Sequence, residues 1–240
     1  MAIFHMSGQI ITRSKGHSSV KAAAYRHGAS FHDERTGEKH DFTKKGRVDD
    51  TIILLPDGAD DRFKDPEYLW NTVEKNEKRK DAQLSREFNI ALPTDLTPEK
   101  NKALAIEYCQ KNFVDKGMIA DIAFHKLDTD NPHFHVMLTM RNLSPDGNSF
   151  GNKNRDWNDK EQVESWRKDW ADTTNQHLEK AGIDARIDHR SLAEQRQELL
   201  AIENPTAEQK KQIDELDRSP GIHKGKSFHA DQKVKASLSD

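Results

Sequence analysis

The sequence predicts an α+β fold in which antiparallel strands alternate along the chain with helices. Two β-rich segments, MIADIAFHKLD and NPHFHVMLTMR, are separated only by a tight turn near residues 128–132, so they must pair as an antiparallel hairpin. A β-prone run, AIFHMSGQII, opens the chain and is followed directly by the helix formers VKAAAY. The chain is therefore expected to begin with a strand that is followed directly by a helix.

The first strand and the first helix form one unit of the prediction. AIFHMSGQII is apolar on both faces, which is typical of a strand near the middle of a covered sheet. Ser18 is a good N-cap, and Gly28 can close the following helix in the left-handed conformation. We expect Tyr25 near the end of this short helix, packed behind the first strand.

The middle of the chain alternates between turns, strands and helices. We expect polar turns over residues 31–50, a short strand in TIILLP (51–56), a helix over 66–82, a strand in LSREFNIALP and a helix from Thr97 to about Val114. The LSREFNIALP strand alternates, so that Glu87 and Asn89 share its polar face.

The last third is expected to be helical. A long loop, SPDGNSFGNKNRDWND, leads to a helix over 160–181, and two charged helices broken at Asn204 and Pro205 follow. These last helices have few large apolar positions. We therefore predict a main domain over residues 1–196 and a charged helical extension or tail over 197–240.

Composition narrows the class of protein. A chain of 240 residues supports one full-sized core plus an appendage, and no segment approaches the roughly 20 apolar residues of a membrane span. We expect a cytoplasmic protein without membrane insertion. The net charge of −3 hides a basic N-terminus, because residues 1–48 hold nine Lys or Arg against four acidic residues. Such a surface could follow a phosphate backbone or could simply be solvated.

Three histidines indicate a metal site. His133 and His135 are two residues apart on a strand and so share a face, and the tight turn places His125 opposite them. Three imidazoles with open positions describe a catalytic metal site, although polar positions on a half-exposed strand would look the same. Glu87 either orients a metal-bound imidazole or accepts a proton, or it is an ordinary surface glutamate.

Tyr25 differs from the other two tyrosines, Tyr68 and Tyr108, which lie in helical patterns with apolar neighbours. Alanines precede it, and Arg26 and His27 follow it, so nearby cations could favour the phenolate of a nucleophile. A tyrosine that only packs the core is the alternative that the residues alone leave open.

Several segments together resemble one family. MAIFHMSGQIITRSKGHSSVKAAAYRHG resembles the opening of the MobA/MobL plasmid relaxases, and REFNIALP, HKLDTDNPHFHVMLTMR, RDWND and RIDHRSLAEQ resemble its later motifs in order, over roughly residues 1–196. The resemblance implies a central five-stranded antiparallel sheet flanked by helices, the HUH relaxase and Rep-like fold. It also implies that Tyr25 is the nucleophile and that His125, His133 and His135 hold Mn²⁺ or Mg²⁺; on ligand preference alone, zinc, cobalt and nickel are also suitable.

The same resemblance implies a function. Members nick and rejoin one DNA strand at a plasmid origin of transfer through a covalent 5′-phosphotyrosine, for conjugative mobilisation. Single-stranded or hairpin DNA is then the substrate, relaxosome accessory proteins and a type IV secretion coupling protein are the partners, and the protein can pass with the DNA into a recipient cell. Expected DNA contacts are basic or aromatic residues: Arg13, Lys15, Arg26, Arg155, Trp157, His189 and Arg190.

Other functions compete with this hypothesis. A rolling-circle replication initiator shares the histidine hairpin but normally places its tyrosine after the histidines, whereas Tyr25 precedes them. A histidine-triad nucleotide hydrolase needs another alternating histidine where Met137 stands. A non-catalytic DNA-binding accessory protein would use only the basic surface. Members often continue into a helicase or primase domain, for which residues after 196 have no room, so we expect a short form or an excised relaxase domain.

Overall fold

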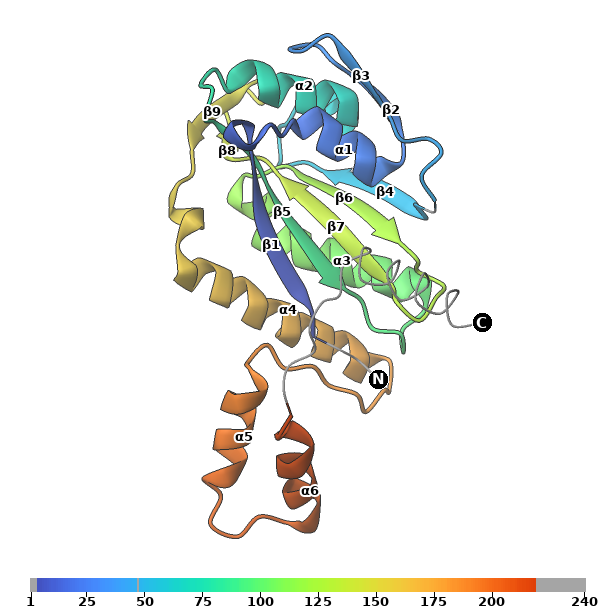
Figure 1. The fold of residues 1–240 in the computed structure, drawn as a ribbon, viewed down its shortest axis with the longest axis vertical. Helices are drawn as coiled ribbons and strands as arrows, with labels where there is room; N and C mark the ends of the chain where they lie inside the picture. Colours follow the sequence, from blue (N-terminus) through green and yellow to red (C-terminus); the bar gives the residue numbers. More distant parts are fainter. Residues whose placement is uncertain (1–3, 47, 219–240) are drawn as a thin grey trace, which may run out of the picture. The chain divides into compact units, whose positions relative to one another are not determined.

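A computed structural model describes residues 4–46 and 48–218, so the first residues of the predicted opening strand and the tail beyond 218 lie outside the described residues. Five antiparallel strands form the main sheet in the order β1-β5-β7-β6-β4 (Figure 1). They are β1 (Met6–Thr12), β4 (Asp50–Leu54), β5 (Gln83–Ala91), β6 (Ala120–His125) and β7 (His133–Leu138). The predicted α+β fold with a five-stranded antiparallel sheet is confirmed.

The position of the first strand differs from the prediction. In the sheet, β1 pairs with β5 alone and forms one edge, while β7 lies at the centre. Ser7, Gly8 and Gln9 of β1 are exposed to solvent. The apolar residues of AIFHMSGQII made the segment resemble a central strand, but strand order depends on distant pairings that one segment does not contain.

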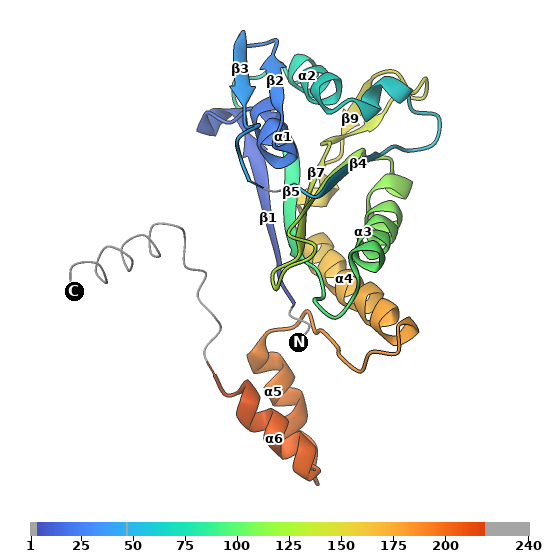
Figure 2. The same cartoon turned by 90° about the vertical axis from the view of Figure 1, so that its right-hand side faces the viewer.

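Two helices cover one face of the sheet. The helices α3 (Pro98–Asn112) and α4 (Lys160–Lys180) lie on the same side, which Figure 2 shows with the sheet nearly edge-on. The side chain of Thr97 caps α3 at Lys100, and Pro98 occupies the first turn, as predicted. Phe88, Phe134 and Trp166 belong to the core of this layer. This face contributes packing, so the opposite face is left for chemistry.

Two further helices cover only one end of the opposite face. The helix α1 (Ser19–His27) begins after the N-cap Ser18 and ends at Gly28 with φ of 58°, as predicted. Beside it lies α2 (Pro66–Asn76). Their buried residues, among them Val20 and Trp70, pack on Met137 of β7. The other end of β7, where its histidines lie, belongs to no part of this core.

The predicted helix over 66–82 is too long, because α2 ends at Asn76. The guanidinium of Arg13 accounts for the early end: it donates to the carbonyl oxygens of Glu74, Glu77 and Arg79 and forms an ion pair with the Glu74 carboxylate. Carbonyls at and beyond the last turn are thus satisfied by a side chain instead of by further helix.

Two hairpins occur where only turns or a loop were expected. β2 (Ser30–Asp33) pairs with β3 (Glu38–Asp41), and β8 (Arg141–Leu143) pairs with β9 (Phe150–Lys153). Their short polar sequences lack the apolar alternation that marks longer strands. The first unit also contains short 3-10 helices: η1 (Arg13–Lys15), η2 (Asp61–Lys64), η3 (Val114–Lys116) and η4 (Asp156–Asn158).

A second compact unit begins at Arg190, after a first unit that ends at His189. It contains α5 (Leu192–Leu200) and α6 (Ala207–Leu216), as the break at Asn204 and Pro205 predicts. Ser191 with Glu194, and Thr206 with Gln209, form capping boxes that start the two helices. The division falls before α5, and residue 196 lies inside that helix. None of the described helices is long and apolar enough to cross a membrane.

Candidate active site

The hairpin of β6 and β7 brings three imidazoles together. His125 lies directly opposite His133 in the register, and His135 follows on the same face of β7. Their ring centroids are 5.4 Å apart for His125 and His133, 5.2 Å for His125 and His135, and 5.6 Å for His133 and His135. The three histidine side chains therefore lie together, as their spacing in the sequence predicts. We call this group the histidine cluster.

Hydrogen bonds orient two of these rings. Nδ1 of His135 lies 3.0 Å from Glu87 Oε1, and Nδ1 of His133 lies 2.9 Å from the carbonyl oxygen of Asn131. An oxygen acceptor at Nδ1 selects the tautomer in which Nδ1 carries the proton, so Nε2 presents a lone pair. Burial lowers the pKa of His133, which also favours the neutral ring. This arrangement is typical of metal-binding histidines.

The spacing of the rings fits a metal ion. Among residues 4–46 and 48–218, no three His, Cys, Asp or Glu side chains are already arranged around one metal position. However, a nitrogen ~2.1 Å from an ion puts the ring centroid about 3.2 Å away, and two such rings at a tetrahedral angle lie about 5.3 Å apart. The centroid distances in the histidine cluster match this value. A rotation of the imidazole rings would therefore be enough to direct their nitrogen atoms at one ion.

Glu87 of β5 is a buried carboxylate with three donors around it. It is 2% exposed and accepts hydrogen bonds from Gln9 Nε2 at 2.8 Å, from Arg26 Nε and from His135 Nδ1. Burial alone would raise the pKa of Glu87, but the hydrogen bonds from His135 and Arg26, with the charge of Arg26, lower it to about 2. The burial rules out an ordinary surface glutamate. A carboxylate held ionised in this way is suited to orienting His135 and not to accepting a proton.

Tyr25 lies on α1 with cations beside its ring. Lys45 Nζ is 3.1 Å from the ring centroid and Arg26 Cζ is 5.0 Å from it, while Phe42 meets the ring edge-on. Arg26 also pairs with Glu87, which in turn accepts from His135. A continuous series of contacts thus joins Tyr25 to the histidine cluster. Lys45 was not identified from the sequence, because the unrecognised β2–β3 hairpin is what returns the chain to α1.

His27 has a different role from the one that its place beside Tyr25 indicates. Its Nε2 lies 2.7 Å from Asp121 Oδ1 on β6, and Trp70 Nε1 donates to the other oxygen of that carboxylate at 2.7 Å. Burial opposes a positive charge on His27, but the attraction and hydrogen bond of Asp121 outweigh it and raise the pKa. These contacts fix α1 on the sheet. The signal that could have identified Asp121 is a single acid within the otherwise apolar strand MIADIAF.

Two predicted DNA contacts are engaged within the protein. Trp157 is 7% exposed and packs among Phe113 and Trp166, so its ring lies within the core, and its stacking on DNA bases stays a prediction. Arg13 directs its guanidinium at the end of α2, as described above, and its side chain is 11% exposed. The structure therefore gives Arg13 a contact that holds two elements together.

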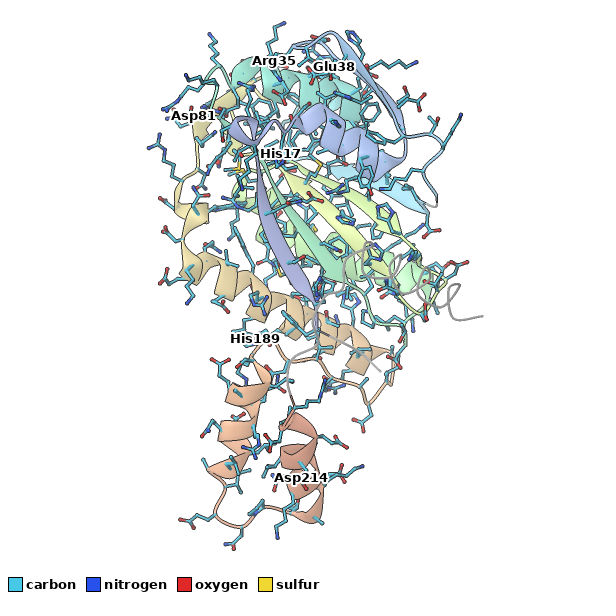
Figure 3. The ribbon with its side chains drawn as sticks, viewed as in Figure 1. His17, Arg35, Glu38, Asp81, His189 and Asp214 are labelled. Atoms are coloured by element: carbon cyan, nitrogen blue, oxygen red, sulfur yellow. The ribbon has the colours of Figure 1, made fainter. Side chains whose placement is uncertain are left out.

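The other predicted DNA contacts occupy varied positions. Arg26 lines a hollow together with Gln9, Glu87, Asn89 and His135. Lys15 and Arg155 are exposed. His189 is partly exposed at the end of the first unit (Figure 3), and Arg190 pairs with Glu198 within the second unit. Arg26 thus shares a hollow with His135 of the histidine cluster, and the DNA-binding role of the whole set stays a prediction.

Comparisons with known proteins agree on one family. A sequence model of the MobA/MobL family matches residues 17–214. The chain is 38% identical over 226 residues to the mobilization protein MobL of Acidithiobacillus ferridurans, which covers 80% of this chain and 59% of the relative. It is also 38% identical over 232 residues to the conjugal transfer protein TraA of Agrobacterium fabrum, which covers 81% of this chain and 20% of TraA. The chain thus spans only part of both relatives.

Solved structures share the fold. One described as the molecular basis of vancomycin resistance transfer in Staphylococcus aureus has a TM-score of 0.75 and 37% identity, and the match covers 79% of this chain and 100% of that one. The conjugative relaxase TrwC in complex with oriT DNA, in its metal-free form, has a TM-score of 0.50 and 12% identity over 98% of each chain, which is a likeness of fold alone. From the match over residues 17–214 and from these relatives, we conclude that the chain belongs to the MobA/MobL family.

Proposed function

We propose that this chain nicks and rejoins one DNA strand at a plasmid origin of transfer, in support of conjugative mobilisation. The observation that carries the proposal is the histidine cluster, with Glu87 and Arg26 linking it to Tyr25. Membership of the MobA/MobL family and the names of the relatives, mobilization and conjugal transfer proteins, support the same function.

Tyr25 is the proposed nucleophile. Its hydroxyl oxygen attacks phosphorus and loses its proton to solvent, the Tyr–O–P bond forms, and the P–O3′ bond breaks. The 3′ oxygen takes up a proton, which leaves a covalent 5′-phosphotyrosine and a free 3′-hydroxyl. Because one phosphodiester replaces another, the reverse reaction can rejoin the strand. Lys45 and Arg26 place positive charge beside the phenol ring as negative charge develops at the reacting oxygen atoms.

His125, His133 and His135 would hold the metal. A bound divalent ion supplies positive charge that polarises a nonbridging phosphate oxygen. Glu87 and the Asn131 carbonyl keep two of the imidazoles in the tautomer that ligation needs. Nitrogen donors suit Mn²⁺ better than Mg²⁺, which prefers oxygen, and zinc, cobalt and nickel are also compatible with this donor set.

The proposed substrate and partners follow from this function. The substrate is single-stranded or hairpin DNA of an origin of transfer, and the partners are relaxosome accessory proteins and a type IV secretion coupling protein. The proposed place of action is the cytoplasm, with passage into a recipient cell while the protein is attached to the DNA. Lys15, which is exposed, is a proposed contact with a phosphate group of the strand.

A covalent adduct with DNA tests the nucleophile. The substrate is a labelled oligonucleotide that carries the inverted repeat found beside the encoding gene, incubated with Mn²⁺. Wild-type protein should form a denaturation-resistant adduct, and Tyr25→Phe should lose it while still binding DNA. Tyr68→Phe on α2 is the matched control and should react normally. DNA binding without any adduct, across several metals and origin sequences, would show instead a non-catalytic accessory protein.

The metal site has a separate test. His133→Ala should abolish adduct formation and greatly weaken Mn²⁺ binding measured by calorimetry, with most of the DNA affinity retained. Cleavage at the wild-type rate by this variant would remove the histidine cluster from the mechanism, while the role of Tyr25 could still stand.

A further inference from the structure

A second hollow adjoins the one beside His135. The first hollow runs from His135 across Glu87 and Gln9 to Arg26. The second shares Gln9, Arg26 and Glu87 with it and continues to His17 and Lys21 at the start of α1. Figure 3 marks His17 near the end of β1, where the chain enters α1. We call the two adjoining hollows together the β1–α1 groove, and the second of them lies away from the histidine cluster along the edge strand.

The far part of the β1–α1 groove carries positive charge. Lys21 and His17 are exposed there, whereas the charge of Arg26 is offset by its ion pair with Glu87. No carboxylate of the described residues lies within ion-pairing distance of Lys21. Lys21 is thus the cation of this groove whose charge is available to a ligand.

The N-terminus of α1 does not itself provide the binding groups. The amide of Lys21 donates to Ser18 Oγ at 3.2 Å, and the amide of Ser19 donates to Glu74 Oε1 at 2.8 Å. Two of the amides in the first turn are therefore already satisfied within the protein. An anion in the groove would depend on side chains, and above all on Lys21.

The lining also lacks a platform for bases. Apart from its cations and Glu87, the far hollow is lined by Gln9, Ile11, Gly16, Ser18 and Ala22, and no Phe, Tyr or Trp is among its lining residues. Single-stranded bases bind mainly by stacking on aromatic rings, whereas phosphates need only cations and polar groups. The groove is therefore suited to the backbone of a strand and not to its bases.

We propose that the β1–α1 groove holds the sugar–phosphate backbone of the strand on one side of the scissile phosphate, with Lys21 contacting a phosphate independently of sequence. This inference rests on the proposed function, because it takes the histidine cluster as the place of cleavage. It adds a path for the strand, and it assigns a residue that the basic N-terminal sequence alone did not single out.

Salt-dependent DNA binding tests the proposal. Fluorescence anisotropy would measure the Kd of wild-type protein, Lys21→Ala and Lys21→Arg for a thymidine homopolymer and a mixed-sequence oligonucleotide of equal length. Loss of one phosphate contact should lower the slope of log K against log salt by about 0.7, which corresponds to about fivefold weaker binding at 0.1 M salt. The loss should be equal for both oligonucleotides, and Lys21→Arg should bind like wild type. Lys111→Ala is the matched control, since Lys111 is an exposed lysine of α3 on the opposite face of the sheet.

The outcomes separate this inference from the proposed function. An unchanged Kd and slope for Lys21→Ala would overturn it, even if the protein still forms the covalent adduct. A loss confined to one of the two sequences would also overturn it, because base recognition would then be responsible. If wild-type protein forms no adduct, the proposed function fails, while the effect of Lys21→Ala on binding still decides whether the groove contacts DNA.

Discussion

Glu87 is the residue on which three elements of the site converge. Gln9 of β1, Arg26 of α1 and His135 of β7 all donate to its carboxylate. Each contact alone is modest, but together they keep a 2% exposed acid ionised, with a pKa of about 2. The price of this arrangement is a buried charge that becomes unfavourable when any of its partners is lost.

Glu87→Gln should weaken Mn²⁺ binding about 10- to 100-fold, because His135 loses the charged acceptor that orients it. It should also remove a pH dependence of stability. The folded pKa of Glu87 lies below its ordinary value of 4.5, so its stabilisation is present above pH 4.5 and fades as the pH falls towards 2. Between pH 7 and pH 3, the stability difference between wild type and Glu87→Gln should shrink by about 2 kcal/mol.

Urea unfolding at each pH measures that difference, and calorimetry measures the metal affinity. Glu179→Gln, at an exposed position of α4, is the control and should change neither quantity. A difference in stability that stays constant between pH 7 and pH 3 would mean that Glu87 is not held ionised by its neighbours.

Among the helices and strands, the sequence predicted correctly those features that depend on neighbouring residues. The caps at Ser18 and Thr97 and the tight turn before His133 lie within a few residues of the helices and strands that they fix. The edge position of β1 and the contact of Lys45 with Tyr25 depend on segments that are distant in sequence. The histidine cluster was therefore predictable from sequence, while the surroundings of Tyr25 were not.

The short turn η4 and the helix α4 illustrate the same limit. In the sequence, Trp157 lies in a polar loop, but its ring fills a space between Trp166 of α4 and Phe113 after α3. Trp157→Ala should lower the free energy of unfolding by about 3–5 kcal/mol and leave the DNA affinity of the folded protein unchanged. Arg155→Ala, two residues away and exposed, should change stability by less than about 0.5 kcal/mol. If Trp157→Ala instead stays stable and binds DNA weakly, the ring is a DNA contact after all.

For the whole molecule, the proposed site and the hydrophobic cores belong to the first compact unit. Both hydrophobic clusters consist of residues before His189, and so do Tyr25, Glu87 and the histidine cluster. In the described part of the second unit, Ile213 is the one buried hydrophobic residue, and capping boxes define its two helices. Both hydrophobic clusters are therefore made up of residues of the first unit alone.

A chain that ends at His189 should consequently fold and react. We expect a Tm within a few degrees of the full chain, since the buried residues of the two clusters are all retained. The yield of covalent adduct per mole of folded protein should also be unchanged, because Tyr25, Glu87 and the histidine cluster all remain. Thermal unfolding and adduct formation by both chains measure this. A shortened chain that unfolds cooperatively but forms no adduct would show that residues from Arg190 onward act in cleavage, most simply by binding the strand that the site must hold.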